Sequence, residues 1–434
     1  MELQHVHHFM DFVRKSPTAY QAVAEAEKLL RDQGFQKLGL YADWKLTEGG
    51  RYYCTRNGSS LIAFVMPKTA SFDHFQLVCS HSDSPAFVLK ENPEENAVHC
   101  VRLNTEGYGG MILSSWLDKP LGIAGRIYAR RTDGVLECRL VDFGRDMCII
   151  PNMCIHLMRD TNSGYAYNPQ TDMMPLWGMD GIRSVRKAVR REFCQADETI
   201  VSMELYLYNR TPGMIFGEEA FFSCPRIDNL ECAYTSLLSV MQNAPDGQVN
   251  VCGIFDNEEV GSATKQGANS DLLRSVLESI CELSGMNPLQ TRSAIASSLM
   301  ISADNAHAVH PNHPEKFDAD NRVFLNEGVV IKRSANQKYT TDAISNAMFR
   351  EVCERAQVPV QCFHNRSDIP GGSTLGNLAN IHAGMSTVDI GLAQLSMHSC
   401  YETAGTQDLE HMIKALTAFY AARIEIGEKT LRFS

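Results

Sequence analysis

Beyond Pro225 the chain alternates short apolar runs with longer segments of helical character. The apolar runs are VNVCGIF, SLMISA and MSTVDIGL, and the helical segments are DNLECAYTSLLSVM, DLLRSVLESICEL, AISNAMFREVCERA and LEHMIKALTAFYAARI. Such alternation is typical of a sheet that is covered by helices. The sequence therefore predicts an α/β fold for this part of the chain.

The N-terminal part of the chain adds a helix and two strands to this pattern. Ser16 and Pro17 offer an N-cap and a proline for the first turn of a helix that Gly34 can end. Strands are predicted at LIAFVM and FQLVCS, and the second runs directly into the polar sequence HSDSP at residues 81–85. In α/β proteins, chemistry-bearing side chains commonly follow the carboxyl end of a buried strand.

Residues 93–224 have a different character. ENPEEN resembles a linker, and the apolar runs IYARR and VLECRL flank Thr132-Asp133-Gly134 as two strands of a hairpin. A chain of 434 residues is also longer than one ordinary domain. We therefore expect a discontinuous α/β catalytic domain, residues 1–92 and 225–434, with a β-rich domain inserted at residues 93–224.

The charge and the cysteines restrict the partners and the compartment. A formal net charge of -11 without a long Lys/Arg cluster would repel nucleic acid and anionic membranes, so we expect neither partner. No signal peptide and no apolar run long enough to span a bilayer is predicted. The 14 cysteines are scattered and form no C-x-x-C pair. These features predict a soluble, cytoplasmic protein with buried free thiols.

Metal-competent side chains follow predicted strands or precede predicted helices at five places. They are His81 with Asp83, Asp228, the pair Glu258 and Glu259, Asp304, and His398. Each has an ordinary alternative: a surface turn for His81, a helix N-cap for Asp228, solvated loop carboxylates for the glutamates, a turn for Asp304 and a packed histidine for His398. Together, two histidines and three carboxylates suit two zinc ions that share a bridging carboxylate.

The remaining two acidic residues fit supporting roles around such a centre. In an extended segment His81 and Asp83 lie on the same face, so Asp83 can orient the imidazole ring. Glu258 and Glu259 place two like charges side by side where a strand ends, and buried cations would offset their repulsion. One glutamate can bind metal while the other acts as a general base for water.

The order of motifs along the chain resembles the aspartyl aminopeptidase family of dinuclear zinc exopeptidases. The matching motifs cover nearly the whole chain and are HSDSP, RIDNL, FDNEEVGS, SADNAHAVHPNH, VIKRSANQKYTTDAIS, PGGSTLGN and VDIGLAQLSMHS. The resemblance implies a mixed sheet of the zinc-exopeptidase type. It implies the zinc ligands His81, Asp228 as the bridge, Glu259, Asp304 and His398, with Glu258 as the general base.

The resemblance also implies substrate contacts and assembly. His307, Lys332 and Tyr339 fall at substrate-binding positions of the family, Asp304 adjoins them, and Gly372 and Ser373 lie on the pocket rim. His156 in the insert matches a histidine that reaches a neighbouring subunit's active site. The family's tetrahedral dodecamer is therefore an expectation for this chain, with the insert supplying the oligomer contacts.

The expected activity is removal of N-terminal Asp or Glu from peptides. A metal-bridging hydroxide would attack the peptide carbonyl, and two zinc ions per subunit, with Mn or Co as substitutes, would support it. The loop from Gly371 to Asn377 and Tyr401 depart from the family pattern, which makes acidic specificity less secure than the chemistry. An amide deacylase and a non-catalytic metal-binding scaffold are the two alternative functions.

Overall fold

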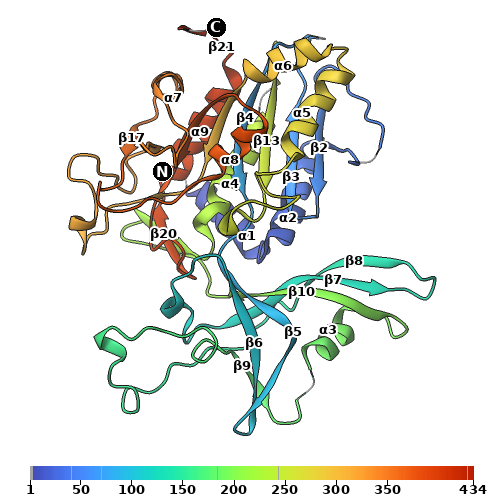
Figure 1. Ribbon diagram of the computed structural model, residues 1–434, viewed down its shortest axis with the longest axis vertical. Helices are drawn as coiled ribbons and strands as arrows, with labels where there is room; N and C mark the ends of the chain where they lie inside the picture. The colour runs from blue at the N-terminus through green and yellow to red at the C-terminus, as the bar shows by residue number, and fades with distance from the viewer. Residues whose placement is uncertain (1–2, 41, 70, 183, 243, 428) are drawn as a thin grey trace.

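The computed structural model describes residues 3–434 except 41, 70, 183, 243 and 428, and it forms two lobes (Figure 1). The large lobe is built on a mixed nine-stranded sheet, in which β13, β4, β14 and β18 are parallel. Strand β3 is antiparallel to both of its neighbours, whereas β16 is antiparallel to β18 and parallel to β17. In spatial order the strands are β1 (Gln36–Lys37), β2 (Arg51–Arg56), β3 (Ser60–Val65), β13 (Gln248–Phe255), β4 (His74–His81), β14 (Leu299–Ala303), β18 (Ser386–Gly391), β16 (Val329–Lys332) and β17 (Val360–Phe363).

Helices cover both faces of this sheet, which confirms the predicted fold class. On one face the apolar core joins the sheet to α2 (Ala19–Asp32), α4 (Ile227–Gln242), α7 (Ala343–Arg355) and α9 (Asp408–Ala421). On the other face it joins the sheet to α5 (Leu272–Leu283), α6 (Pro288–Ala296) and α8 (Leu375–His382). The buried apolar side chains of β3, β13, β4 and β14 alternate between these two cores, as period-2 pleating requires.

The predicted start of the second helix is wrong by two residues. The helix α1 (Gln4–Lys15) ends with Ser16 as its C-cap, so Ser16 cannot begin the next helix. The N-cap of α2 is Thr18, whose side chain accepts a hydrogen bond from the backbone N–H of Tyr20. The change in chain direction between the two helices therefore takes place at Ser16-Pro17.

A second lobe, drawn below the first in Figure 1, contains a six-stranded antiparallel sheet. Its strands, in spatial order, are β8 (Leu136–Asp142), β7 (Leu121–Arg130), β10 (Thr199–Asn209), β5 (Ala86–Ala97), β6 (Cys100–Tyr108) and β9 (Leu176–Met179). The helix α3 (Val185–Phe193) packs on it and shares its apolar core. The hairpin expected around Thr132-Asp133-Gly134 joins β7 to β8.

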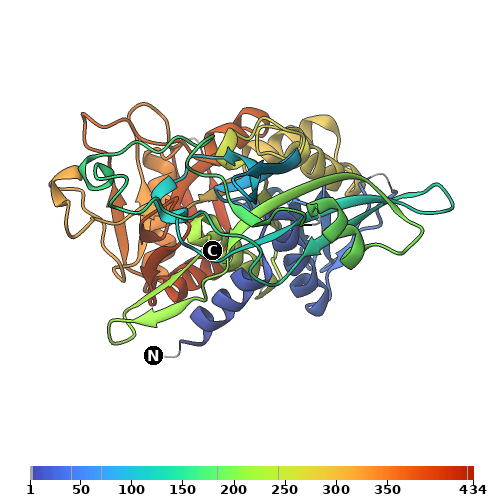
Figure 2. The ribbon, with the colours of Figure 1, turned by 90° about the horizontal axis from the view of Figure 1, so that it is seen from below.

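The strands at the junction of the lobes suggest where the inserted lobe begins and ends. The boundary expected at residue 93 falls inside β5, and β12 (Phe221–Cys224) pairs with β20 (Glu402–Gly405) near the C-terminus. We therefore propose that the inserted lobe comprises about residues 86–209. The view from below shows its long strands crossing beneath the large lobe, with the β7–β8 hairpin reaching beyond it (Figure 2).

The remaining secondary structure consists of short strands and turns. A five-stranded sheet contains, in order, β11 (Met214–Phe216), β12, β20, β19 (Ala393–Leu395) and β15 (Ala306–His307). Short elements complete the fold: β21 (Ile424–Ile426), β22 (Leu431–Phe433) and the 3-10 turns η1 (Leu113–Trp116), η2 (Thr161–Ser163), η3 (Glu258–Val260) and η4 (Pro314–Lys316). In the part of the chain that the structure describes, no helix has the length and apolar character needed to cross a membrane.

The carboxyl edge of the nine-stranded sheet faces the inserted lobe. Strands β4 and β13 are parallel and in register up to their ends, because His81 pairs with Phe255. The chain leaves β4 at this edge and enters β5 of the inserted lobe at Ala86. Residues that follow β4, β13 and β14 therefore meet close to the junction of the lobes.

Candidate metal centre

Five segments bring the predicted ligands together at this edge. His81 ends β4, Glu258 and Glu259 follow β13 in η3, and Asp304 follows β14 directly. The remaining two ligands come from the start of α4 and from the loop between β19 and β20. These residues form three groups, and within each group the ligand atoms lie within 4.8 Å of one another. The groups are His81 with Asp228 and Asp304, His81 with Glu258 and Glu259, and Asp228 with Glu259 and His398.

Asp228 joins the two halves of this cluster. Its Oδ1 lies 3.7 Å from His81 Nε2, which is also 3.5 Å from Asp304 Oδ1. Its Oδ2 lies 3.5 Å from His398 Nε2, which is 3.4 Å from Glu259 Oε2. Ligands bound tetrahedrally at zinc distances of about 2.0–2.2 Å are separated by about 3.3–3.6 Å, so these spacings fit two ions that share one carboxylate.

Unsatisfied buried oxygens support the same interpretation. Asp228 Oδ1 and Glu259 Oε1 are buried and, among the described residues, have no hydrogen-bond partner. Burial, together with the neighbouring carboxylates Asp304, Asp83 and Asp228, raises the pKa of Glu258 to about 8, and that of Glu259 rises well above its usual value. Such a cluster needs cations to hold its carboxylates ionised. The donors are imidazole and carboxylate groups, which suit zinc.

Asp228 does not serve as an ordinary helix cap. Although it opens α4, Asp228 and Asn229 have non-helical backbone angles, and the peptide bond between them is cis. The carboxylate faces the two histidines rather than the first turn of the helix. The side chain is thus directed into the cluster, as the metal-ligand hypothesis expects.

Asp83 fixes both the first histidine and the glutamate pair. His81 Nδ1 lies 3.0 Å from the carbonyl oxygen of Asp83 and 3.3 Å from its Oδ1. Because both neighbours are acceptors, Nδ1 carries a proton, and Nε2 is the nitrogen that faces the cluster. The same carboxylate accepts the backbone N–H groups of Glu258 and Glu259 at 3.2 and 3.1 Å. It also accepts the hydroxyl of Tyr108 at 2.6 Å.

Residues 108–112 of the inserted lobe contact the cluster directly. The carbonyl of Gly110 accepts a hydrogen bond from His398 Nδ1 at 2.5 Å, which leaves Nε2 facing Asp228 and Glu259. Gly109 has a φ of +74°, and a Cβ there would lie 3.0 Å from Glu259 Cβ. The sequence did not predict this segment, although two consecutive glycines after a strand indicate a close approach of backbone.

Glu402 is a further residue that the sequence did not predict. It is 2% exposed and accepts the backbone N–H groups of His398 at 2.8 Å and Asp228 at 3.1 Å. His398 has a left-handed φ of +67°, so its loop needs such support. Burial and the charge of Asp228 raise the pKa of Glu402 to about 8. Its only sequence signal is its position four residues after His398.

Lys332 and Tyr339 lie behind Asp304. Lys332 is 3% exposed, and its Nζ donates to the carbonyl of Asn305 at 3.1 Å and lies 3.3 Å from Asp304 Oδ2. The same nitrogen is 5.3 Å from the centre of the buried Tyr339 ring. Although burial opposes its charge, Asp304 and other acidic neighbours raise the pKa of Lys332 above its usual value. In this chain Lys332 is therefore paired with Asp304.

A cavity of about 300 Å³ adjoins the cluster, and we call it the basic cavity. Its lining includes Met397, His307 and Gly372. Met397 directly precedes His398, and His307 follows Asp304 by three residues. Its basic and imidazole side chains are His307, His310, Lys316, His364 and Arg366. Neither Asp nor Glu occurs among the described residues that line it. Ser373, by contrast, is exposed just outside this lining, with its hydroxyl beside Asn377.

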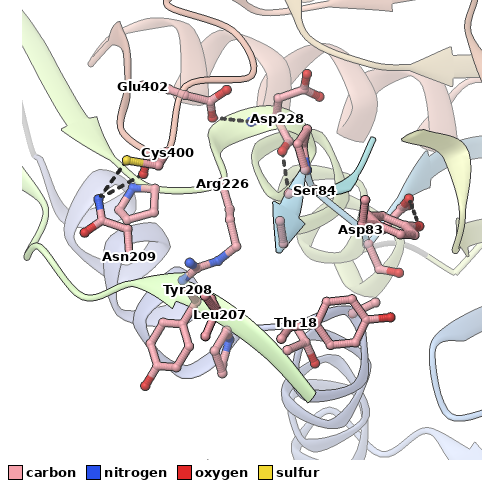
Figure 3. Close-up of a pocket in the computed structure, with 18 of the residues that line it drawn as sticks. Thr18, Asp83, Ser84, Leu207, Tyr208, Asn209, Arg226, Asp228, Cys400 and Glu402 are labelled. Carbon is pink, nitrogen blue, oxygen red and sulfur yellow. Dashed lines mark hydrogen bonds between the residues drawn. The ribbon is translucent and has the colours of Figure 1, made fainter. Parts of the chain in front are cut away.

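A smaller internal cavity lies behind the cluster, where the lobes meet (Figure 3). It measures about 40 Å³, enough for water but not for an amino-acid side chain with its backbone. Arg226 reaches between Asp228 and Tyr208 in this view and donates to the carbonyls of Val13 and Ser16 at the end of α1. The basic cavity is therefore the better candidate for a substrate site.

His156 does not join the cluster within one chain. It is exposed in the long loop between β8 and β9 of the inserted lobe, outside both the cluster and the two cavities. Its expected role in a neighbouring subunit's site therefore stays a prediction.

Comparisons with known proteins identify the family of the chain. Residues 12–420 match the model of the family described as aminopeptidase I zinc metalloprotease (M18). The "Probable M18 family aminopeptidase 2" of Clostridium novyi (strain NT) is 40% identical over 429 residues, covering 96% of this chain and 99% of the relative.

Two solved structures have the same fold. A chain in the structure described as the cryo-EM structure of the Ape4 and Nbr1 complex superposes with a TM-score of 0.91 at 34% identity, covering 96% of this chain and 85% of that one. The mApe1 dodecamer of S. cerevisiae superposes with a TM-score of 0.83 at 26% identity, covering 95% of each chain. With the family match over nearly its whole length, the chain belongs to the M18 family of zinc aminopeptidases.

Proposed function

We propose that this M18 aminopeptidase removes acidic residues, Asp or Glu, from the N-termini of peptides. The observation that carries the proposal is the basic cavity beside the metal centre. The chain has a net charge of -11, yet the described lining of this cavity contains no carboxylate. It contains three imidazoles, Lys316 and Arg366, although Asp368 just outside the lining offsets the charge of Arg366. A carboxylate side chain is attracted to such a site, whereas a lysine or arginine side chain is repelled.

The metal would be held by the residues of the cluster. His81, Asp304 and Asp228 would hold one zinc ion and His398, Glu259 and Asp228 the other, with Mn or Co as substitutes. When bound, the two ions supply Lewis acidity that polarises the peptide carbonyl and lowers the pKa of water. The two histidines are prepared for this role because each donates its Nδ1 proton to an oxygen of the protein.

Glu258 is the proposed general base. Glu259 Oε2 lies 3.4 Å from His398 Nε2, whereas Glu258 Oε2 lies 4.0 Å from His81 Nε2 and is held further from the ligand atoms. Glu258 would take a proton from the attacking water and deliver it to the leaving amine. The raised pKa of its carboxyl is caused by burial and by the acidic residues around it, and bound cations would lower it again.

The inserted lobe is the proposed site of homo-oligomer assembly. Among the residues that the structure describes, 22 large apolar residues are exposed, and 14 of them lie between residues 98 and 201, including Val98 (93% exposed), Leu157 (79%) and Met179 (66%). Exposed apolar groups of this kind are typical of protein interfaces. We expect a dodecamer like that of the S. cerevisiae relative, in which His156 would reach the site of a neighbouring subunit.

Hydrolysis of a peptide panel tests the proposed function. Metal-stripped protein is assayed with and without zinc on peptides that begin with Asp, Glu, Ala, Leu or Lys, and on N-acetyl-Asp peptide. We expect zinc-dependent release of Asp and Glu only. Release of neutral residues at equal rates would contradict the acidic preference, and cleavage of the acetyl group alone would indicate an amide deacylase.

A further inference from the structure

A second basic chamber adjoins the basic cavity, and we call it the outer chamber. It measures about 600 Å³ and is lined by residues 333–338 and 364–371, without residue 337. The two spaces share the wall formed by His364, Asn365, Arg366, Ile369, Pro370 and Gly371. A molecule held in the basic cavity therefore has the outer chamber as its direct neighbour.

The outer chamber carries an excess of positive charge. Asp368 is the single acidic residue among the described residues of its lining, and its carboxylate is bound by Arg366 through two hydrogen bonds of 2.9 and 2.7 Å. Arg333 and Lys338 also line it, and neither forms an ion pair within the described part of the chain. Two cationic groups thus remain available to an anion.

The backbone around the chamber is well defined. The N–H of Arg333 donates to the carbonyl of Phe363 at 3.1 Å, which fixes the point where the chain leaves β16. Gly371 packs against the Asn365 side chain, because a Cβ at residue 371 would lie 2.3 Å from Asn365 Nδ2. The chamber is therefore bounded by this contact on the wall side and by the strand end on the other.

The geometry points to a second carboxylate of the substrate as the ligand of the outer chamber. This inference rests on the proposed function, because it takes the basic cavity as the site of the first acidic residue. An extended peptide advances about 3.3 Å per residue, so the next one or two residues lie within reach of an adjoining space. We propose that Arg333 and Lys338 bind an acidic side chain at the second or third position, or the C-terminal carboxylate of a short peptide.

Peptides that differ only in their second charge test the inference. The panel is Asp-Ala-Ala-Ala-amide, Asp-Asp-Ala-Ala-amide, Asp-Ala-Asp-Ala-amide and the tripeptide Asp-Ala-Ala with a free or amidated C-terminus. The zinc-loaded full chain and its R333Q/K338Q variant are compared at low and high salt. We expect the variant to lose about fivefold in kcat/KM on peptides with a second carboxylate, and less at high salt.

Controls separate this inference from the proposed function. K45Q removes a cation near β1 and β2, at the side of the nine-stranded sheet furthest from β16 and β17, and should not change the relative kcat/KM of the peptides. R333K/K338R keeps both positive charges and should retain the preference for a second carboxylate. The amidated peptides identify which carboxylate is bound. An equal loss on all peptides, or no loss on any, would overturn the inference. Peptides that begin with Ala instead of Asp test the first-residue preference independently. If the preference for an acidic first residue proved wrong, the effect of the second carboxylate could still be measured.

Discussion

The carboxyl edge of the nine-stranded sheet and the inserted lobe contribute to the metal centre in different ways. The edge supplies the charged side chains, including His81 and Asp304, whereas the inserted lobe supplies a hydroxyl and a backbone carbonyl that hold those side chains. At the edge His81, Asp83 and Asp228 are buried, while the inserted lobe exposes much apolar surface. The difference supports our proposal that one lobe carries the chemistry while the other aligns it and makes contacts between subunits.

The largest expected effect separates the two adjacent glutamates at the edge. E258Q should lower kcat by about 10³-fold while leaving zinc content unchanged, because a general base contributes about 10²–10⁴-fold. E259Q should instead lose zinc. Kinetics and elemental analysis of both variants measure this. If E258Q kept near-normal activity, Glu258 would not be the base.

Removal of the Tyr108 hydroxyl, which the inserted lobe provides, should weaken zinc binding by about tenfold to hundredfold. Y108F removes the donor to Asp83, which orients His81 and the glutamate turn, and partners of metal ligands typically contribute about 10–100-fold in affinity or activity. Zinc affinity is measured by competition with a chelator. Y165F, which removes a part-buried hydroxyl contact to Asp172 in the same lobe, away from the metal centre, should behave as the unaltered protein.

A matched pair of glycines tests the close approach of the lobes. G109A and G134A both force an alanine into a left-handed conformation, with φ of +74° and +84°, at a cost of about 1–2 kcal/mol. Only the Cβ at residue 109 would meet Glu259, at 3.0 Å, because nothing lies within 4 Å of the one at residue 134. We expect both to lower the free energy of unfolding similarly and only G109A to weaken zinc binding. Equal zinc affinities would show that the contact has no role.

The smallest effect on the stability of one chain is expected at the apolar surface of the inserted lobe. L157E changes a residue that is 79% exposed, so the free energy of unfolding should shift by about 0.5 kcal/mol or less. Burying the new charge in a subunit contact would nevertheless be unfavourable. Sedimentation velocity should therefore detect smaller assemblies. An unchanged assembly would place the subunit contact elsewhere.

The sequence predicted the edge better than the inserted lobe for a physical reason. His81 and Asp304 follow apolar strands, and parallel strands bring their carboxyl ends to one edge, so local pattern alone indicates their meeting. The contribution of Gly110 is a backbone carbonyl, which leaves no mark in the sequence. Lys332 carries a side chain that suits an acidic substrate, and only the three-dimensional structure shows it paired with Asp304.

The linker interpretation of ENPEEN was wrong for a related reason. ENPEEN has the composition of a linker, yet its residues belong to β5, because pairing with β6 stabilises the segment against its local preference. Pairing partners such as β12 and β20 are separated by nearly 180 residues, and no local pattern reveals them.

Anomalous diffraction at the zinc absorption edge, from crystals of the zinc-loaded protein, tests the central claim most directly. We predict two peaks per chain, one contacted by His81 and Asp304 and the other by His398 and Glu259, with an oxygen of Asp228 bound to each. A single peak, or an Asp228 carboxylate that contacts only one ion, would contradict the account of a two-zinc centre at the edge of the sheet.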